Sequence, residues 1–222
     1  MHGGICIMKA CIFDLDGTLT DTLESLAYSV KATLREMDLP EITTDECRRF
    51  VGDGARCLME RSLRATGEEN VKRIEEAMEI YGRIFDENCT YHVTPYEGIV
   101  QMLKSMKDKG IKLAVLSNKP HQQTVKVVRE VFGEEMFDFA QGQKEEIARK
   151  PDPAGVNYLM EQMGVSQEEC LYVGDSEVDI RTGKNAGLRT ISVAWGFRSK
   201  EVLETAGADT IIGSPEELLQ FV

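Results

Sequence analysis

The sequence contains no apolar run long enough to cross a bilayer, and its first residues have neither the long apolar segment nor the cleavage site of a signal peptide. Cys-x-x-Cys pairs are also absent, although six cysteines are scattered along the chain: Cys6, Cys11, Cys47, Cys57, Cys89 and Cys170. This pattern argues against a disulfide framework and against a zinc site. We therefore expect reduced, buried thiols in a cytoplasmic protein.

Basic residues and histidines are few as well. Lys and Arg total 26 against 38 Asp and Glu, which gives a formal net charge of -12. That balance argues against nucleic acid or an anionic membrane as a partner. None of the three histidines, His2, His92 and His121, has a metal or triad partner at a telling spacing. An anionic substrate would therefore need a bound divalent metal and a few well-placed cations.

The 222 residues divide into two kinds of pattern. Residues 21–90 show only helical periodicity, whereas the rest alternates short apolar strands with helices. Such alternation predicts an α/β fold with a doubly wound, Rossmann-like parallel sheet. We expect a core of residues 1–20 and 91–222 and an inserted all-helical domain of residues 21–90. The expected strands are 10–13, 111–116, 137–140, 170–173, 190–193 and 210–212, and the expected hinges are 20–21 and 90–96.

Two carboxylates and a glycine follow the first of these strands. Asp14 and Asp16 are two positions apart, so on extended backbone they project to the same side, and Gly17 allows a sharp turn. Two anions at this spacing need a cation or a proton between them. Taken alone, Asp-x-Asp-Gly is more often an ordinary surface turn.

Polar residues follow two further strands, and ligands of such sheets bind beyond the carboxyl ends of the strands. Ser117 and Asn118 follow one of these strands, and Asp175 and Asp179 follow the other. A lysine, Lys150, stands separately, just before the start of a helix. Separately they would be a loop pair, a helix cap with a first-turn acid, and a surface lysine. Together, oxygen ligands of this kind suit Mg²⁺, and a metal, a lysine and a hydroxyl suit a phosphoryl group.

These segments resemble the four ordered motifs of the haloacid dehalogenase-like hydrolases. The matching segments are residues 14–21, Ser117-Asn118, Lys150-Pro151 and Gly174-Asp175-x-x-x-Asp179. The insert resembles the helical cap domain of the phosphoglycolate phosphatase branch, chiefly at residues 51–56 and 59–61. Residues 195–198 and 206–209 are also similar to that branch.

The resemblance implies a role for each matching residue. Asp14 would attack phosphorus and form an aspartyl-phosphate, and Asp16 would protonate the leaving oxygen and then activate water. Mg²⁺ would be held by Asp14, the backbone carbonyl of Asp16 and Asp175, with Asp179 ordering that site. The phosphoryl oxygens would be held by Ser117, Asn118 and Lys150. Candidate specificity residues in the cap domain are Gly52, Asp53, Gly54 and Arg56.

The resemblance therefore implies a Mg²⁺-dependent phosphatase that hydrolyses a small, phosphoglycolate-like phosphomonoester. We expect the protein to be a monomer or a homodimer. In that reaction Arg56, or Arg49, would pair with a substrate carboxylate. An inorganic pyrophosphatase or a sugar-phosphate mutase would share all four motifs and stays open. A phosphoacceptor signalling domain, which is a different class, also uses paired acids, a hydroxyl and a lysine, but it needs no domain that closes over a substrate.

Overall fold

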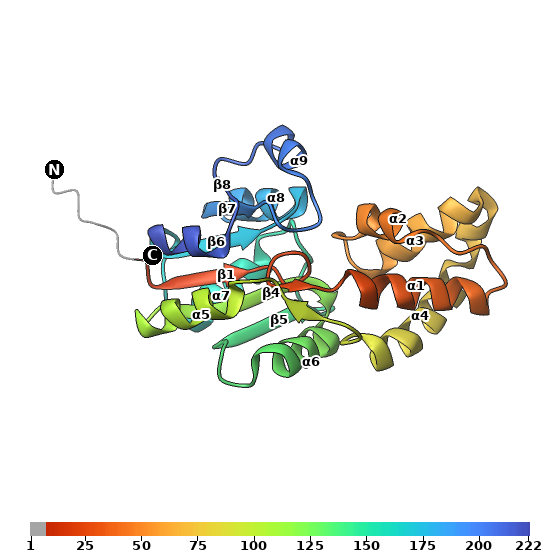
Figure 1. The fold of residues 1–222 in the computed structure, drawn as a ribbon, viewed down its shortest axis with the longest axis horizontal. Coiled ribbons are helices and arrows are strands. Elements are labelled where there is room, and N and C mark those ends of the chain that lie inside the picture. The colour runs from red at the N-terminus through yellow and green to blue at the C-terminus, as the bar shows by residue number, and fades with distance from the viewer. Residues whose placement is uncertain (1–7) are drawn as a thin grey trace.

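The structure, a computed structural model, describes residues 8–222 (Figure 1). It contains the expected doubly wound α/β core, whose six parallel strands run in the order β5-β4-β1-β6-β7-β8. His2, Cys6 and the first part of the predicted core segment 1–20 lie outside the described residues. The strands are β1 (Ala10–Phe13), β4 (Lys112–Pro120), β5 (Phe139–Gln143), β6 (Cys170–Gly174), β7 (Arg189–Val193) and β8 (Ile211–Ile212).

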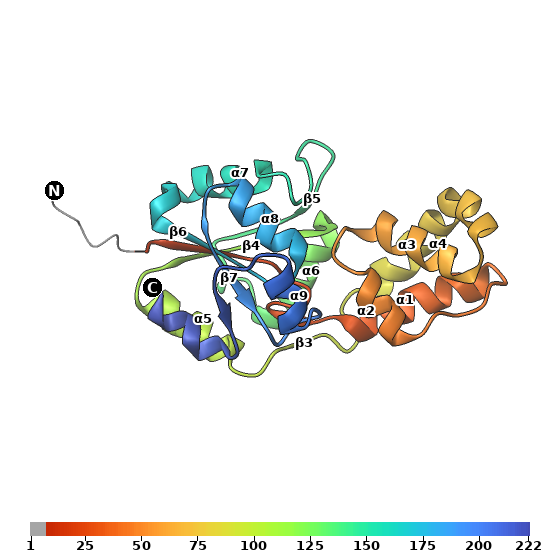
Figure 2. The same cartoon turned by 90° about the horizontal axis from the view of Figure 1, so that it is seen from above.

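The central strand β1 is buried on both faces, which explains why its sequence is apolar throughout rather than alternating. Cys11 and Phe13 belong to the hydrophobic cluster on one face, and Ala10 and Ile12 to the cluster on the other. Figure 2 shows helices above and below the sheet. The first face is covered by α5 (Ile99–Asp108) and α6 (His121–Phe132), and the second by α7 (Ala154–Met163) and α8 (Glu177–Asn185).

Residues 23–88 form a group of helices beyond the carboxyl ends of the strands, here called the helical unit (Figure 1). As expected, this stretch contains no strand. The unit consists of α1 (Leu23–Glu36), α2 (Thr44–Phe50), α3 (Ala55–Thr66), the 3₁₀ segment η1 (Glu68–Arg73) and α4 (Ile74–Asn88). The chain enters it through β2 (Thr20–Asp21) and leaves it through β3 (Thr94–Pro95), and these strands pair antiparallel.

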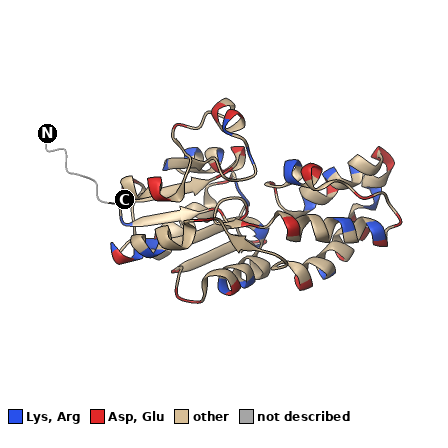
Figure 3. Ribbon diagram, viewed as in Figure 1, with Lys and Arg blue, Asp and Glu red and all other residues tan. Residues whose placement is uncertain are grey.

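Several boundaries differ from the sequence-based expectations. Strand β4 continues through Ser117, Asn118 and Lys119 to Pro120, and β5 begins two residues later than expected. The core also contains the short helix α9 (Lys200–Thr205) and two 3₁₀ segments, η2 (Gln167–Glu169) and η3 (Pro215–Gln220). In Figure 3 the charged residues lie mostly on the helices and loops, while the sheet is almost free of them.

The state of the cysteines and the length of the helices agree with the sequence-based expectations. The five described cysteines are free thiols, four of them buried and Cys57 half-buried. Among residues 8–222, every helix is too short or too polar to span a bilayer.

Candidate active site

The predicted site residues come together at one edge of the sheet, because β1, β4 and β6 are parallel neighbours that end there. Asp14 directly follows β1, and its backbone N–H donates to the Val173 carbonyl of β6 at 2.9 Å. Asp175 directly follows β6, and Ser117 lies near the end of β4. The three side chains line one cavity.

Lys150 joins two of the carboxylates. Its Nζ lies 2.8 Å from Asp14 Oδ1 and 2.8 Å from Asp179 Oδ1, and all three side chains are almost fully buried. Burial lowers the Lys150 pKa, but Asp14 and Asp179 raise it well above its ordinary value, so the ammonium form is retained. Asp179 also accepts hydrogen bonds from Tyr172 Oη (2.9 Å) and Ser176 Oγ (2.5 Å), so every oxygen of its carboxylate is engaged.

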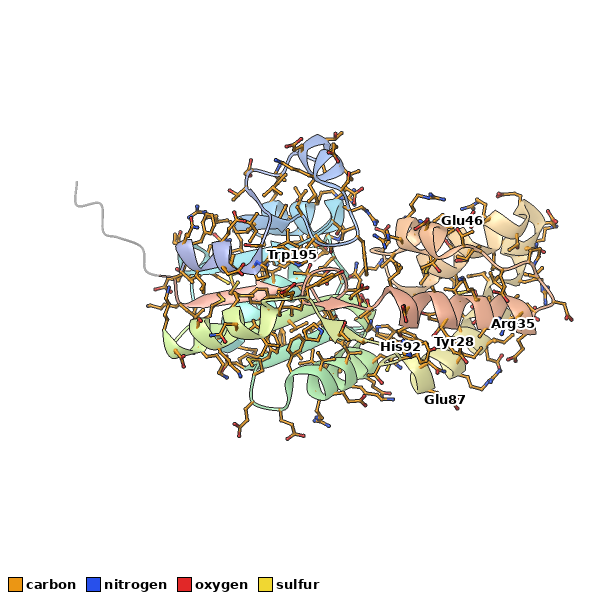
Figure 4. The ribbon with its side chains drawn as sticks, in the orientation of Figure 1. Tyr28, Arg35, Glu46, Glu87, His92 and Trp195 are labelled. Carbon is orange, nitrogen blue, oxygen red and sulfur yellow. The ribbon has the colours of Figure 1, made fainter. Side chains whose placement is uncertain are left out.

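Asp175 is held from two sides. Thr18 Oγ1 donates to its Oδ1 at 3.3 Å, and the Phe197 N–H donates to its Oδ2 at 2.7 Å. The Thr18 carbonyl in turn accepts a hydrogen bond at 3.0 Å from Nε1 of Trp195, a side chain labelled in Figure 4. Burial raises the pKa of Asp175 to about 7, and the neighbouring Asp179 adds to the rise.

Asp14, Asp175 and Asp179 fit a divalent cation. One oxygen from each of the three lies within 4.8 Å of the others. Burial raises the pKa of Asp14 well above its usual range, and the neighbouring Asp179 adds to this, so a cation bound beside Asp14 would favour the ionised carboxylate that burial disfavours. Asp14 and Asp175 line the cavity and Asp179 does not, so Asp14 and Asp175 are the carboxylates that face a hard cation there, which prefers oxygen ligands.

Asp16 lies on the same cavity but has its own partners. Its Oδ1 accepts hydrogen bonds from Thr22 Oγ1 at 2.7 Å and from Lys119 Nζ at 2.6 Å. Thr22 stands at the entrance to the helical unit, so the position of Asp16 is tied to the junction between that unit and the sheet.

Asn118 connects three segments through its side chain. Its Nδ2 donates to the carbonyls of Lys150 (3.1 Å) and Gly52 (3.2 Å), and its Oδ1 accepts from the Lys150 N–H (2.9 Å). Its amide therefore fixes the backbone that carries Lys150 and holds the loop between α2 and α3. Ser117 Oγ accepts from the Lys119 N–H at 3.2 Å, which leaves its own hydroxyl proton free to donate.

The helical unit closes the cavity with a largely apolar wall. That wall consists of Leu26, Val51, Ala55, Leu58, Tyr81 and Phe85. Two aromatic rings within it, those of Tyr81 and Phe85, are stacked with centroids 5.1 Å apart. A reacting group between this wall and the sheet edge is shielded from water, which strengthens the electrostatic interactions inside.

The four specificity candidates of the helical unit are not all brought to the cavity. Gly52 and Gly54 line it, and both have positive φ (+128° and +89°), which favours glycine; a Cβ at Gly54 would also lie 3.3 Å from the Asn118 carbonyl oxygen of β4. Asp53 instead pairs with Arg61 at 2.5 Å. Arg56 is outside the cavity lining, half-exposed, and its guanidinium lies 2.6 Å from Glu75. The structure thus does not bring Arg56 to the site.

Sequence reasoning missed three basic residues at this edge. Lys119 binds Asp16, and Arg198 donates to the carbonyls of Arg48 (3.0 Å) and Val51 (2.6 Å). Arg149 donates to the Asp53 carbonyl at 3.1 Å. All three stand beside motifs that were recognised, but nothing in the local pattern indicates that their partners lie in the helical unit or at Asp16.

Comparison with known proteins agrees with this geometry. The model of the haloacid dehalogenase-like hydrolase family matches residues 11–193. A phosphoglycolate phosphatase of Aquifex aeolicus (strain VF5) is 33% identical over 215 residues, which covers 97% of each chain. A predicted phosphoglycolate phosphatase from Haemophilus somnus 129PT superimposes with a TM-score of 0.87 at 26% identity, covering 98% of this chain and 99% of that one. CbbY from Rhodobacter sphaeroides, solved in complex with phosphate, gives a TM-score of 0.74 at 25% identity, covering 96% of each.

Fold, motifs and family match therefore agree: the chain belongs to the haloacid dehalogenase-like hydrolases. Its relatives place it in the phosphoglycolate phosphatase-like branch of that family. The resemblance drawn from the sequence is confirmed, and so is the enzyme class, a phosphoric monoester hydrolase.

Proposed function

We propose that this enzyme is a Mg²⁺-dependent phosphatase that hydrolyses a small phosphorylated metabolite, phosphoglycolate or a close analogue, through an aspartyl-phosphate on Asp14. The observation that carries the proposal is the grouping of Asp14, Asp16, Lys150 and Asp175 on one cavity at the sheet edge. The phosphoglycolate phosphatase relatives support the substrate. We also propose the division into a core of residues 1–20 and 91–222 and a cap domain of residues 21–90 that closes over the substrate.

In the first step Asp14 attacks phosphorus while the bond from phosphorus to the bridging oxygen breaks. Asp14 Oδ1 is held by Lys150 Nζ and by the Leu15 N–H at 2.7 Å, which fixes the carboxylate in one orientation. Asp16 gives its proton to the leaving oxygen, so the alcohol departs neutral. Ser117 and Lys150 donate to the phosphoryl oxygens as their negative charge spreads.

In the second step Asp16 takes a proton from water, the water oxygen attacks phosphorus, and the bond to Asp14 breaks to release phosphate. Asp14, the carbonyl of Asp16 and Asp175 would hold Mg²⁺, with Asp179 and Lys150 keeping that set in place. When bound, the cation screens the repulsion between the Asp14 carboxylate and the phosphoryl group.

Phosphate release from a panel of phosphorylated metabolites tests the proposal, each assayed by kcat/KM with Mg²⁺ and with excess chelator. We expect phosphoglycolate to rank high, activity to require the metal, and Asp14→Asn to lose multiple turnover. Asp108→Asn, the same substitution at an exposed site on α5, is the matched control. Acid-quenched mass spectrometry should find phosphate on the peptide that contains Asp14.

Two results would contradict the proposal. Turnover that persists in excess chelator would exclude the metal, and multiple turnover by Asp14→Asn would exclude the nucleophile. Pyrophosphate as the best substrate, or isomerisation of a sugar phosphate, would assign the same site to the pyrophosphatase or mutase alternative. A stable phosphorylated protein without turnover would assign it to a phosphoacceptor.

A further inference from the structure

Lys119 is a buried lysine whose ammonium group reaches the cavity. Its side chain is only 2% exposed, and its Nζ lies 2.6 Å from Asp16 Oδ1. The same Nζ stands 5.3 Å from the centroid of the Phe85 ring, which belongs to the helical unit. Lys119 therefore sits between the residue expected to protonate the leaving oxygen and the wall that faces the leaving group.

The two buried lysines of the site differ in how many carboxylates they contact. Lys150 Nζ bridges two, Asp14 and Asp179, at 2.8 Å each. Within residues 8–222, Lys119 Nζ donates a hydrogen bond only to Asp16. An ammonium group carries three N–H donors, so Lys119 keeps donor capacity on the side of the cavity.

The other basic groups near the cavity are committed elsewhere. Arg198 donates to the carbonyls of Arg48 in α2 and Val51 just after it, and to Glu177 Oε2 at 3.0 Å. Arg56 pairs with Glu75 outside the cavity. Lys119 is thus the cation positioned to meet a second anionic group of a substrate.

The place of Lys119 also limits where that second group can lie. Asp16 must approach the bridging oxygen in order to protonate it, and Lys119 Nζ is in hydrogen-bond contact with Asp16. A carboxylate joined to the carbon next to the bridging oxygen would lie within reach of the ammonium. Around it, the apolar side chains of Leu58, Tyr81 and Phe85 lower the local dielectric and strengthen the charge interaction.

We propose that Lys119 is the specificity residue that binds the substrate carboxylate, so that the enzyme selects phosphomonoesters of short 2-hydroxy acids. The inference rests on the proposed phosphatase function and assigns to Lys119 the contact that the sequence had suggested for Arg56. In the bound state Lys119 bridges Asp16 and the substrate carboxylate, as Lys150 bridges Asp14 and Asp179.

A matched pair of substrates isolates this contact. Phosphoglycolate and 2-hydroxyethyl phosphate have the same chain length, but the second carries a neutral hydroxymethyl group in place of the carboxylate. Lys119→Gln removes the charge and keeps a donor for Asp16, so any disturbance of Asp16 affects both substrates alike. We expect kcat/KM for phosphoglycolate to fall about 10- to 100-fold further than for 2-hydroxyethyl phosphate, mostly through KM, as for loss of a charge-assisted hydrogen bond. Lys119→Arg should retain most of the preference, and Lys104→Met on the surface of α5 should retain all of it.

Binding measurements separate this inference from the proposed function. Calorimetric titration of both esters into Asp14→Asn and into Asp14→Asn with Lys119→Gln compares affinities without turnover. A loss of affinity confined to phosphoglycolate supports the role of Lys119 even if the wild type hydrolyses neither ester. Equal losses for both esters, in kinetics and in binding, would overturn it. If Lys119→Gln does not fold, the same comparison is made with Lys119→Met, which also removes the charge, and equal losses for both esters in that variant would overturn the inference.

Discussion

Replacing Lys150 by methionine removes the ammonium group between Asp14 and Asp179 and keeps an unbranched side chain of similar length. Lys150 is 3% exposed and the two carboxylates are 12% and 0% exposed, so water cannot take over the role of the ammonium. The substitution therefore leaves two buried carboxylates without the ammonium group that they share, so their negative charges repel each other.

The size of the effect follows from the geometry. At 2.8 Å and an effective dielectric constant of about 20, each of the two contacts corresponds to about 6 kcal/mol of attraction. The ammonium no longer has to be desolvated in the variant, which offsets part of this loss. Breaking a buried pair by removing one partner typically costs about 3–5 kcal/mol, which we take as the expected fall in the free energy of unfolding. Since the free energy of unfolding of a domain is commonly about 5–15 kcal/mol, the variant should still fold.

Urea unfolding followed by circular dichroism, in the presence of chelator, measures this difference. Lys104→Met, which removes an exposed lysine of α5, is the control and should stay within about 0.5 kcal/mol of wild type. Adding Asp179→Asn to Lys150→Met removes one of the uncompensated charges and should restore part of the stability. A Lys150→Met variant as stable as the Lys104→Met control would refute the reasoning.

Three further outcomes are expected. A Cβ at Gly196 would lie 2.3 Å from a backbone carbonyl oxygen. Gly196→Ala should therefore lower the free energy of unfolding by about 1–3 kcal/mol, as measured by urea unfolding. Gly82 has open space around it, so Gly82→Ala should not lower the free energy of unfolding. Arg198→Ala should speed amide hydrogen exchange at the end of α2 and in the loop after it, because Arg198 donates to the carbonyls of Arg48 and Val51; an unchanged rate there would argue against this role. Burial raises the pKa of Cys47 and Cys170 to about 12, so at pH 8 only about one thiol in ten thousand is ionised. An alkylating reagent should therefore modify these two cysteines only when the protein unfolds, as followed by mass spectrometry. Rapid labelling of the native protein would contradict this.

The architecture was predictable because each strand of the core is a short apolar run between turn residues. Buried strands such as β1 keep that signal on both faces. The end of β4 was not predictable in the same way. Ser117, Asn118 and Lys119 are polar, which is typical of a loop, yet they continue the strand because their side chains find partners in the cavity and the helical unit.

The grouping of the site residues followed from strand topology, but the specificity contact did not. Arg56 looked suitable because it is basic and near the predicted loop, whereas its partner Glu75 lies nineteen residues further along. Lys119 and Asp16 are 103 residues apart. Helical periodicity tells which face of an element is buried, but it does not tell which acid a given base will meet across the fold.

The antiparallel pairing of β2 with β3 has a consequence for how the molecule is assembled. Thr20 faces Pro95 and Asp21 faces Thr94, so the chain enters and leaves the helical unit at the same place. The 72 intervening residues, 22–93, can therefore be exchanged or deleted as one segment, with the cut ends near enough for a short linker. The same point of attachment would let homologous enzymes change their lids, and with them their substrates, while the hydrolytic framework beneath remains as it is.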